Sequence, residues 1–169
     1  MSNIRIHPAL PLGALILASL SAASAFAVDV ARNLMSSAAG VCQGALPNYE
    51  GNIRKRPLAV VNEGSSDAFV TCAFPGFGGE VHDTYYLYVR NRGSDTITFT
   101  CTAVYGSEVE GTPVYVTKSV PRAPGVSGSL FWLPGDGIGT AYPTSVSCLL
   151  PPGGAIGNVH TVQFVDVGS

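Results

Sequence analysis

The feature that most constrains the fold is a two-residue alternation over residues 84–105. In the first half, Tyr85, Leu87 and Val89 alternate with polar or partly polar side chains. In the second half, apolar side chains occupy one parity and threonines the other: Ile97, Phe99, Cys101, Ala103 and Tyr105 against Thr96, Thr98, Thr100 and Thr102. A period of two is typical of a β-strand with one covered face. The pattern therefore predicts amphipathic strands over residues 84–90 and 96–105.

Residues 91–95 between these strands are typical of a turn, so we expect an antiparallel hairpin. When the apolar faces are aligned, Val89 lies opposite Ile97 and Leu87 lies opposite Phe99. A shift of one residue would place the apolar face of each strand against the polar face of the other. The alternation itself therefore predicts the register of the hairpin.

The polar face of this hairpin is the best candidate for a binding site. The predicted register places two tyrosines beside two threonines: Tyr86, Tyr88, Thr98 and Thr100. Flat rings and hydroxyl groups in one patch can stack on a sugar or a peptide and hydrogen-bond to it. The alternative is that these residues only support the strands, because Tyr and Thr are enriched in strands whatever their use.

Six more short strands are predicted from apolar runs: residues 58–62, 68–74, 113–120, 129–133, 145–150 and 159–167. The chain has 20 glycines and 12 prolines, and many of them lie between these runs, as is typical of an all-β domain. A short helix is predicted over residues 30–39, with Asp29 as its N-cap and Gly40 at its end. Eight strands with no helix between them predict an antiparallel β-sandwich or jelly roll.

Residues 1–27 have the features of a secretory signal peptide. Arg5 precedes an apolar run, and small residues lead to Ala25-Phe26-Ala27, which matches the A-x-A pattern of cleavage sites. We expect cleavage after Ala27, with Ala25 as the second choice. An uncleaved anchor is the alternative, although the small residues at its end make a poor spanning helix. Residues 28–169 are expected to form a single domain, secreted or periplasmic, without membrane attachment after cleavage.

The four cysteines all follow the predicted signal: Cys42, Cys72, Cys101 and Cys148. An even number of cysteines in an exported chain favours two disulfides. Their spacings of 30, 29 and 47 positions supply no close pair of zinc ligands. Four cysteines allow three pairings, and the sequence alone does not choose among them. Our preference is Cys42 with Cys72 and Cys101 with Cys148.

The charge of the chain argues against two classes of partner. A formal charge of −2 with 12% charged residues creates no field that would hold nucleic acid or an anionic membrane. No cofactor or metal is expected either. The densest titratable group is Glu80, His82 and Asp83, with His160 elsewhere, and it lacks the paired histidine spacing of a metal site.

Three functions stay open. The preferred one is a binding or interaction module for an unknown extracytoplasmic ligand or protein, such as a carbohydrate or a peptide. The second is a small hydrolase that uses His82 or His160 as its base, although the segment around Ser127 lacks the last glycine of a nucleophile elbow. The third is a structural subunit of a surface assembly, which would add residues 159–167 to the edge of a neighbouring sheet.

Short motifs recur around the cysteines: Cys42, Val70-Thr71-Cys72, Phe99-Thr100-Cys101 and Cys148-Leu149-Leu150-Pro151-Pro152-Gly153. In these positions the chain resembles a loose group of small exported bacterial proteins of unknown function. That group has an early cysteine, Val-x-Cys strands and a Cys-x-Leu-Pro-Pro-Gly ending. The resemblance implies export and disulfide bonds, and it implies no activity.

Overall fold

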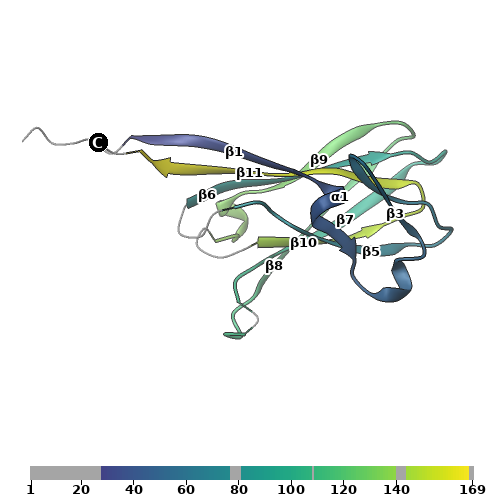
Figure 1. Cartoon of the computed structure of the whole chain (residues 1–169), viewed down its shortest axis with the longest axis horizontal. Coiled ribbons are helices and arrows are strands. Elements are labelled where there is room, and N and C mark those ends of the chain that lie inside the picture. The colour runs from purple at the N-terminus through teal and green to yellow at the C-terminus, as the bar shows by residue number, and fades with distance from the viewer. Residues whose placement is uncertain (1–27, 77–80, 108, 140–143, 168–169) are drawn as a thin grey trace, which may run out of the picture.

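Two antiparallel β-sheets lie face to face, which confirms the predicted β-sandwich (Figure 1). The structure is a computed structural model that describes residues 28–76, 81–107, 109–139 and 144–167, and for Val81 and His82 it describes the backbone alone. The predicted signal peptide lies outside the described residues. Within them, no helix has the length and apolar character needed to cross a membrane.

Within the described ranges, six strands form sheet A, in the order β3-β4-β11-β6-β9 with β1 also beside β11. Their bounds are β1 Asp29–Ser37, β3 Ile53–Arg56, β4 Ala59–Asn62, β6 Val81–Asn91, β9 Ser127–Trp132 and β11 Gly154–Asp166. Sheet B has the order β2-β5-β10-β7-β8, with bounds β2 Cys42–Gly44, β5 Ala68–Ala73, β7 Ile97–Tyr105, β8 Val114–Arg122 and β10 Thr144–Leu150. The helical elements are short: α1 Ala38–Val41 and the 3₁₀ turns η1 Pro47–Tyr49 and η2 Pro134–Asp136.

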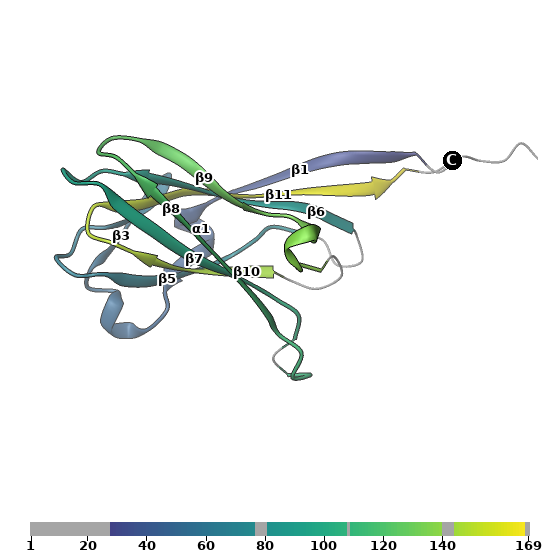
Figure 2. The same cartoon turned by 180° about the vertical axis from the view of Figure 1, so that it is seen from behind.

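The predicted helix over residues 30–39 is wrong, because most of it forms strand β1. This strand pairs with β11 from Asp29 opposite Asp166 to Ser37 opposite Asn158. The two strands extend past the rest of the sheets in both views of the fold (Figures 1 and 2). Pairing along a whole neighbouring strand outweighs a weak local preference for helix. Of residues 30–39, only Ala38 and Ala39 are helical, in the short helix α1 that carries the chain from β1 to β2.

The predicted hairpin is wrong in its pairing, although its covered faces are confirmed. Strand β6 lies in sheet A between β11 and β9, whereas β7 lies in sheet B between β10 and β8. Six of the eight side chains predicted to be covered are at most 3% exposed, and Ile97 and Tyr105 are half-buried. The six are Tyr85, Leu87 and Val89 from β6, and Phe99, Cys101 and Ala103 from β7. They belong to the core between the two sheets. Alternation identifies the covered face of a strand, but it does not say whether the neighbouring strand lies in the same sheet.

Asn91 turns the chain from sheet A to sheet B after β6. Its side chain is fully buried, and its Nδ2 donates to the carbonyl oxygens of Asp95 (2.7 Å) and Arg122 (2.8 Å). Its Oδ1 accepts a hydrogen bond from the main-chain N–H of Gly93 (2.8 Å). Because Arg122 ends β8 in sheet B, residues 91–95 form an arch between the sheets and not a hairpin turn.

The disulfides join Cys42 to Cys72 and Cys101 to Cys148, which confirms the preferred pairing. In each pair the two cysteines lie directly opposite each other on neighbouring strands of sheet B. All four side chains are at most 2% exposed. The disulfides therefore tie β2 to β5 and β7 to β10 from the core side of the sheet.

Trp132 links the two sheets along the edge where β9 and β8 meet. Its ring is fully buried, and its Nε1–H donates to the carbonyl oxygen of Val116 (2.9 Å). The ring also packs against Phe74, with 6.2 Å between centroids and an interplanar angle of 71°. One side chain from sheet A thus supplies both packing and a hydrogen bond to sheet B.

Strand β11 is paired along both of its edges, with β6 on one side and with β4 and β1 on the other. Its main-chain groups are therefore occupied within the chain. The predicted addition of residues 159–167 to a neighbouring sheet is wrong, because strand addition needs a free edge.

Candidate functional site

The predicted patch of Tyr86, Tyr88, Thr98 and Thr100 is divided between the two outer faces of the sandwich. The tyrosines lie on sheet A and the threonines on sheet B, because β6 and β7 belong to different sheets. Side chains that point away from the core on β6 and on β7 therefore point in opposite directions. Thr100 instead pairs with Ser119 on β8, with 2.9 Å between the hydroxyl oxygens. The prediction that these four residues share one surface is wrong.

The tyrosines belong to a group of rings on the outer face of sheet A. Tyr86 lies opposite His160 of β11 and opposite Phe131 of β9. Its ring centroid is 5.3 Å from that of His160 and 6.1 Å from that of Phe131. Tyr88 lies 6.4 Å from Tyr86 and 6.5 Å from His160. We call Tyr86, Tyr88, Phe131 and His160 the aromatic cluster.

Three rings of the aromatic cluster are nearly parallel. The interplanar angles are 24° for Tyr86 and Tyr88, 20° for Tyr86 and His160, and 24° for Tyr88 and His160. All of these residues stand on paired strands of sheet A, so the backbone register determines their spacing. The cluster is therefore a rigid surface formed before any ligand binds.

His160 is a neutral member of this cluster. Its Nε2–H donates to Oδ1 of Asn33 on β1 (3.1 Å), so Nδ1 is the unprotonated nitrogen. Nδ1 is buried and has no hydrogen-bond partner among the described residues. Burial lowers the pKa of His160, because a proton on Nδ1 would add a charge with no acceptor beside it.

The surroundings of His160 do not match those of a catalytic base. A serine hydrolase needs a nucleophilic hydroxyl at one nitrogen of the histidine and a carboxylate at the other. In the described part of the chain, His160 has Asn33 at Nε2 and no partner at Nδ1. The backbone of His82 pairs with Gln163, and Glu80 lies outside the described residues. No group of three His, Cys, Asp or Glu side chains that could hold a metal occurs among those described.

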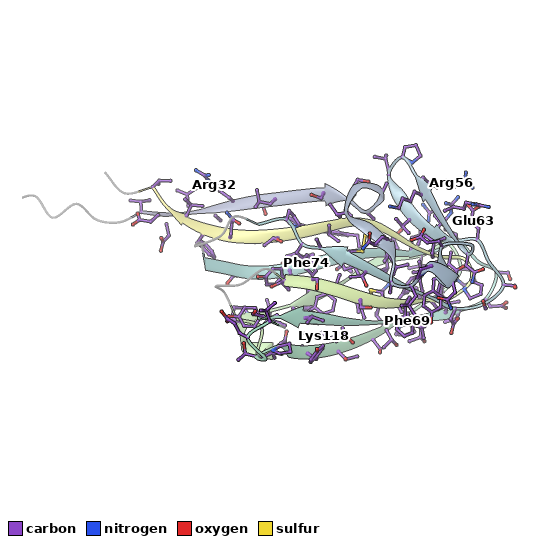
Figure 3. The ribbon with its side chains drawn as sticks, turned by 60° about the horizontal axis from the view of Figure 1, so that its bottom comes forward. Arg32, Arg56, Glu63, Phe69, Phe74 and Lys118 are labelled. Atoms are coloured by element: carbon purple, nitrogen blue, oxygen red, sulfur yellow. A yellow bond between two sulfur atoms is a disulfide. The ribbon has the colours of Figure 1, made fainter. Side chains whose placement is uncertain are left out.

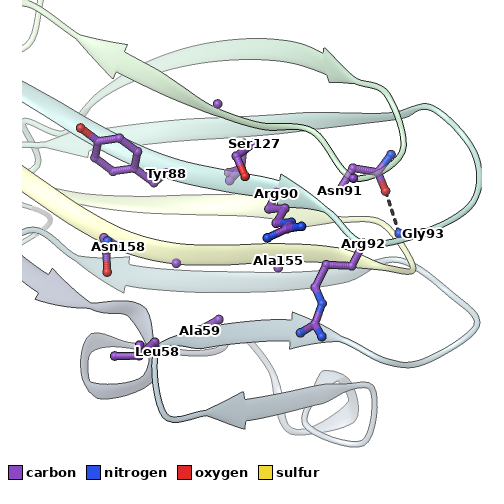
Figure 4. Close-up of a pocket in the computed structure, with 14 residues that line it drawn as sticks. Leu58, Ala59, Tyr88, Arg90, Asn91, Arg92, Gly93, Ser127, Ala155 and Asn158 are labelled. Atoms are coloured by element: carbon purple, nitrogen blue, oxygen red, sulfur yellow. Dashed lines mark hydrogen bonds between the residues drawn. The ribbon is translucent and has the colours of Figure 1, made fainter.

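A groove of about 700 Å³ lies next to Tyr88 on the outer face of sheet A (Figure 4). Small residues are frequent in its lining: Ala59, Gly125, Gly128, Ala155 and Gly157. The larger side chains around it include Leu58, Tyr88, Arg90 and Arg92. A cavity of this volume is in the usual range for small-molecule sites.

A bulge in β11 helps to shape this groove. Ile156 pairs with Val89 and Val159 pairs with Leu87, so two residues of β11 oppose the single residue Tyr88. Because of the extra residue, Ile156 and Val159 point to the same face although they are three positions apart, and both are fully buried. Bulges are frequent beside binding sites because they redirect side chains. Here Gly157 and Asn158, the residues of the bulge, both line the groove.

Sequence reasoning identified Tyr86 and Tyr88 but missed Phe131 and the arginines. Phe131 lies in a run in which both parities are apolar, so the pattern did not indicate that this residue is 45% exposed. Arg90 and Arg92 have no distinctive spacing, and the groove brings them together with residues of β4 and β11. His160 was considered only as a base or a metal ligand, and its contacts with the tyrosines depend on the pairing of β11 with β6.

Fold and site together define an antiparallel β-sandwich with a groove and an aromatic cluster on one outer face. No protein-family model and no curated protein matches the chain. The resemblance to small exported bacterial proteins therefore stays a prediction.

Several solved structures align with most of the chain. The C-terminal CBM6 of LamC, a marine laminarinase from Zobellia galactanivorans, matches with a TM-score of 0.45 and 8% identity over 77% of this chain and 98% of that one. The GH26-CBM35 β-(1,4)-mannanase of Podospora anserina matches with a TM-score of 0.43 and 10% identity over 78% of this chain. The CBM22-1-GH10 modules of xylanase 10B from Clostridium thermocellum, solved with xylohexaose, match with a TM-score of 0.41 and 19% identity over 85% of this chain. The chain spans 27% and 28% of these last two structures.

Proposed function

We propose that the protein is an extracytoplasmic binding module that holds a carbohydrate on the outer face of sheet A. The observation that carries this proposal is the position of Tyr88. Tyr88 is 38% exposed and lines the groove, and its ring stacks against Tyr86 and His160. A sugar ring has flat faces of C–H groups that pack on aromatic rings, and its hydroxyl groups need nearby hydrogen-bonding groups. Both kinds of contact are available beside Tyr88.

The polar contacts would come from the other lining residues. Arg90, Arg92, Ser127 and Asn158 surround the groove with donors and acceptors. Most of them lie on strands, so they are held in place before binding and little conformational entropy is lost. This supports recognition of a ligand with many hydroxyl groups.

A peptide is a less suitable occupant than a sugar. Peptides that bind to sheets usually add a strand to a free edge, where main-chain groups are available. The groove lies on the face of sheet A, over strands that are paired with their neighbours, such as β11. A ligand on this face must be held by side chains, as an aromatic surface holds a sugar.

The exposed apolar surface continues beyond the groove. Met35 of β1 is 60% exposed and lies opposite His160 of β11. On the next two strands, Tyr86 of β6 lies opposite His160, and Phe131 of β9 lies opposite Tyr86. Four neighbouring strands place this row across about 14 Å of the sheet, at about 4.8 Å for each step. The length of the row favours an oligosaccharide over a single sugar.

Export is part of this proposal. Two disulfides are typical of proteins in oxidising compartments, and this supports a secreted or periplasmic location. It also agrees with the signal peptide predicted over residues 1–27. N-terminal sequencing of the exported protein is expected to begin at Val28, and recovery of an uncleaved chain in the membrane fraction would argue for an anchor instead.

A glycan array with the exported protein tests carbohydrate binding. We expect Tyr88→Ala to weaken binding of the best glycan by about tenfold or more, since an aromatic contact contributes about 1 kcal/mol beyond its burial. Tyr115→Ala is the matched control, because Tyr115 is 59% exposed but lies on β8 in sheet B. Thr98→Ala is a second control on that face. Absence of binding to every glycan, or equal losses in Tyr88→Ala and Tyr115→Ala, would refute the proposal.

A further inference from the structure

We propose that the groove selects glycans that carry negatively charged groups, carboxylate or sulfate, and that Arg90 and Arg92 bind those groups. This inference rests on the proposed carbohydrate binding and adds the chemical class of the sugar. The groove is positively charged. Two arginines and no Asp or Glu occur among the residues that line it.

Both arginines extend from the same part of the wall. Arg90 lies near the end of β6, opposite Ala155 of β11 and Ser127 of β9. Arg92 follows two residues later, in the arch that leaves sheet A. In the close-up, both side chains reach over the groove, Arg90 above β11 and Arg92 toward β4 (Figure 4). Their positive charges are therefore concentrated on one side of the cavity.

Neither guanidinium group has a carboxylate partner in the described part of the chain. The ion pairs found there are Arg56 with Glu63, and Lys118 with Asp136 (2.6 Å). Arg56 and Glu63 lie together at one end of the molecule (Figure 3). The protein as a whole has more acidic than basic residues, so two unpaired arginines in one groove do not follow from a generally basic surface.

The chemistry of arginine indicates what would pair with them. A guanidinium group presents N–H donors in a planar fork, which matches two oxygens of a carboxylate or a sulfate. Concave sites with one sign of charge also concentrate ions of the opposite sign. A neutral sugar in this groove would shield both charges from water and offer no anion in return.

The backbone of Arg92 is held in place for this contact. Its N–H donates to the carbonyl oxygen of Gly153 (2.8 Å). On either side of it, Asn91 is buried and Gly93 donates to the Asn91 side chain (2.8 Å; Figure 4). A fixed backbone reduces the entropy lost when the side chain binds.

A further arginine extends the positive surface on the same face. Ala155 lies opposite Val61 of β4, and Val61 lies opposite Arg54 of β3. Residues directly opposite each other in antiparallel strands share a face, so Arg54 is on the outer side of sheet A with Arg90. Arg54 has no ion pair with a described residue. A charged oligosaccharide that extends beyond the groove would meet it.

Calorimetric titration with three oligosaccharides of equal length tests the proposal: an oligogalacturonate, a sulfated galactan and a neutral galactan. We expect at least one charged probe to bind the exported protein about tenfold or more tightly than the neutral one, a difference of about 1.4 kcal/mol. The carboxylate and sulfate probes distinguish the two sources of charge.

Four variants locate the effect. Arg90→Gln and Arg92→Gln are each expected to weaken binding of the charged probe by about tenfold and to weaken binding of the neutral probe by a smaller factor, because glutamine keeps hydrogen-bonding groups but loses the charge. Arg90→Lys keeps the charge without the fork and is expected to lie in between. Arg32→Gln removes the same charge from β1, at the other end of the molecule from Arg56 and Glu63 (Figure 3), and is expected to bind as the wild type does. Thermal unfolding of each variant confirms that it is folded.

The outcomes separate this inference from the proposed function. Equal affinity for the charged and neutral galactans, unaffected by the arginine variants, would overturn the charge selectivity and leave carbohydrate binding intact. Equal affinity for a polyglutamate of the same charge would overturn the assignment to a sugar. Absence of binding to all three oligosaccharides would overturn the charge selectivity, and the glycan array described above decides separately whether the protein binds a carbohydrate.

Discussion

Asn62 and Asn91 make the same three hydrogen bonds at two crossings from sheet A to sheet B. Each ends a strand of sheet A, β4 or β6, and each is at most 1% exposed. The side-chain Nδ2 of each asparagine donates two hydrogen bonds, one to the carbonyl oxygen of the residue four positions later and one to the carbonyl oxygen of the last residue of a strand in sheet B. The side-chain Oδ1 accepts one hydrogen bond, from the main-chain N–H of the residue two positions later. The partners are Ser66 O (2.8 Å), Leu150 O (2.7 Å) and Gly64 N (3.0 Å) for Asn62, and Asp95 O (2.7 Å), Arg122 O (2.8 Å) and Gly93 N (2.8 Å) for Asn91.

Both crossings share the sequence Asn-x-Gly-Ser, at residues 62–65 and 91–94. In each case the asparagine replaces hydrogen bonds that the backbone loses when it leaves the sheet. Glycine follows two residues later, where the chain bends back toward the amide. The shared motif therefore marks an arch between sheets, and it explains why residues 91–95 do not close a hairpin.

Replacing either asparagine is expected to destabilise the fold strongly. Asn62→Ala and Asn91→Ala each remove three hydrogen bonds and leave buried groups unpaired, so we expect the free energy of unfolding to fall by about 2–4 kcal/mol in each variant. Urea unfolding followed by the fluorescence of Trp132 measures this change. Asn48→Ala, in an exposed turn, is the control and is expected to change stability by less than about 0.5 kcal/mol. Losses below about 1 kcal/mol at both arches would contradict this account.

Removal of the disulfides is expected to have additive effects. The segments closed by Cys42–Cys72 and Cys101–Cys148 do not overlap, with sequence separations of 30 and 47. Loop entropy predicts a contribution of about 3.5–4 kcal/mol from each bond. Replacing each pair by alanines should therefore lower the free energy of unfolding by similar amounts, measured by denaturant titration.

The variant without either disulfide is expected to be largely unfolded at room temperature, because the two losses together approach the whole stability of a typical domain. Wild-type protein treated with a reductant should behave in the same way. A reduced protein that unfolds at the same denaturant concentration as the oxidised one would show that the disulfides do not stabilise this fold.

Gly153 is expected to tolerate no side chain. Its φ angle is +76°, and a Cβ atom there would lie 2.8 Å from the main-chain N and Cα of Gly93. Gly153→Ala combines this contact with left-handed backbone strain of about 1–2 kcal/mol. We expect a clear fall in melting temperature, measured by circular dichroism. Gly51→Ala is the control, because nothing lies within 4 Å of its added Cβ; an equal fall in both variants would argue against the close approach.

Acidification is expected to destabilise the protein through His160. Burial lowers the pKa of His160 in the folded state from its ordinary value of 6.5. Just below pH 6.5, His160 is therefore protonated in the unfolded chain and still neutral in the folded chain. The free energy of unfolding should therefore fall as the pH drops below 6.5, until the pKa of the folded state is reached. His160→Phe keeps a flat ring without a titrating group, and its stability should depend less on pH over the same range. Parallel pH profiles for the two proteins, measured by thermal unfolding, would contradict the assignment.

The candidate site was predictable only in part. Tyr86 and Tyr88 stand out because their parity on β6 is opposite to that of the buried Leu87. Their partners do not stand out, because His160 reaches them through a strand that begins more than sixty residues later. The groove also depends on the bulge at Gly157 and Asn158, and a bulge is recognised by comparing two paired strands.

Local alternation in the sequence determined which side chains of β6 and β7 are buried, and the position of the cysteines after a signal-like segment determined that disulfides were expected. Only the tertiary structure decided that β6 and β7 belong to different sheets, that the tyrosines and threonines face opposite ways, and that Arg90 and Arg92 share a groove with Tyr88. The physical reason is that burial patterns are set by each strand's own side chains, whereas hydrogen bonds between strands join residues far apart in the chain. The apolar face of a strand is covered by the layer packed on it, whichever strand pairs with its edge. The same alternation therefore fits a hairpin within one sheet or an arch between two sheets, and the hydrogen bonds of Asn91 favour the arch.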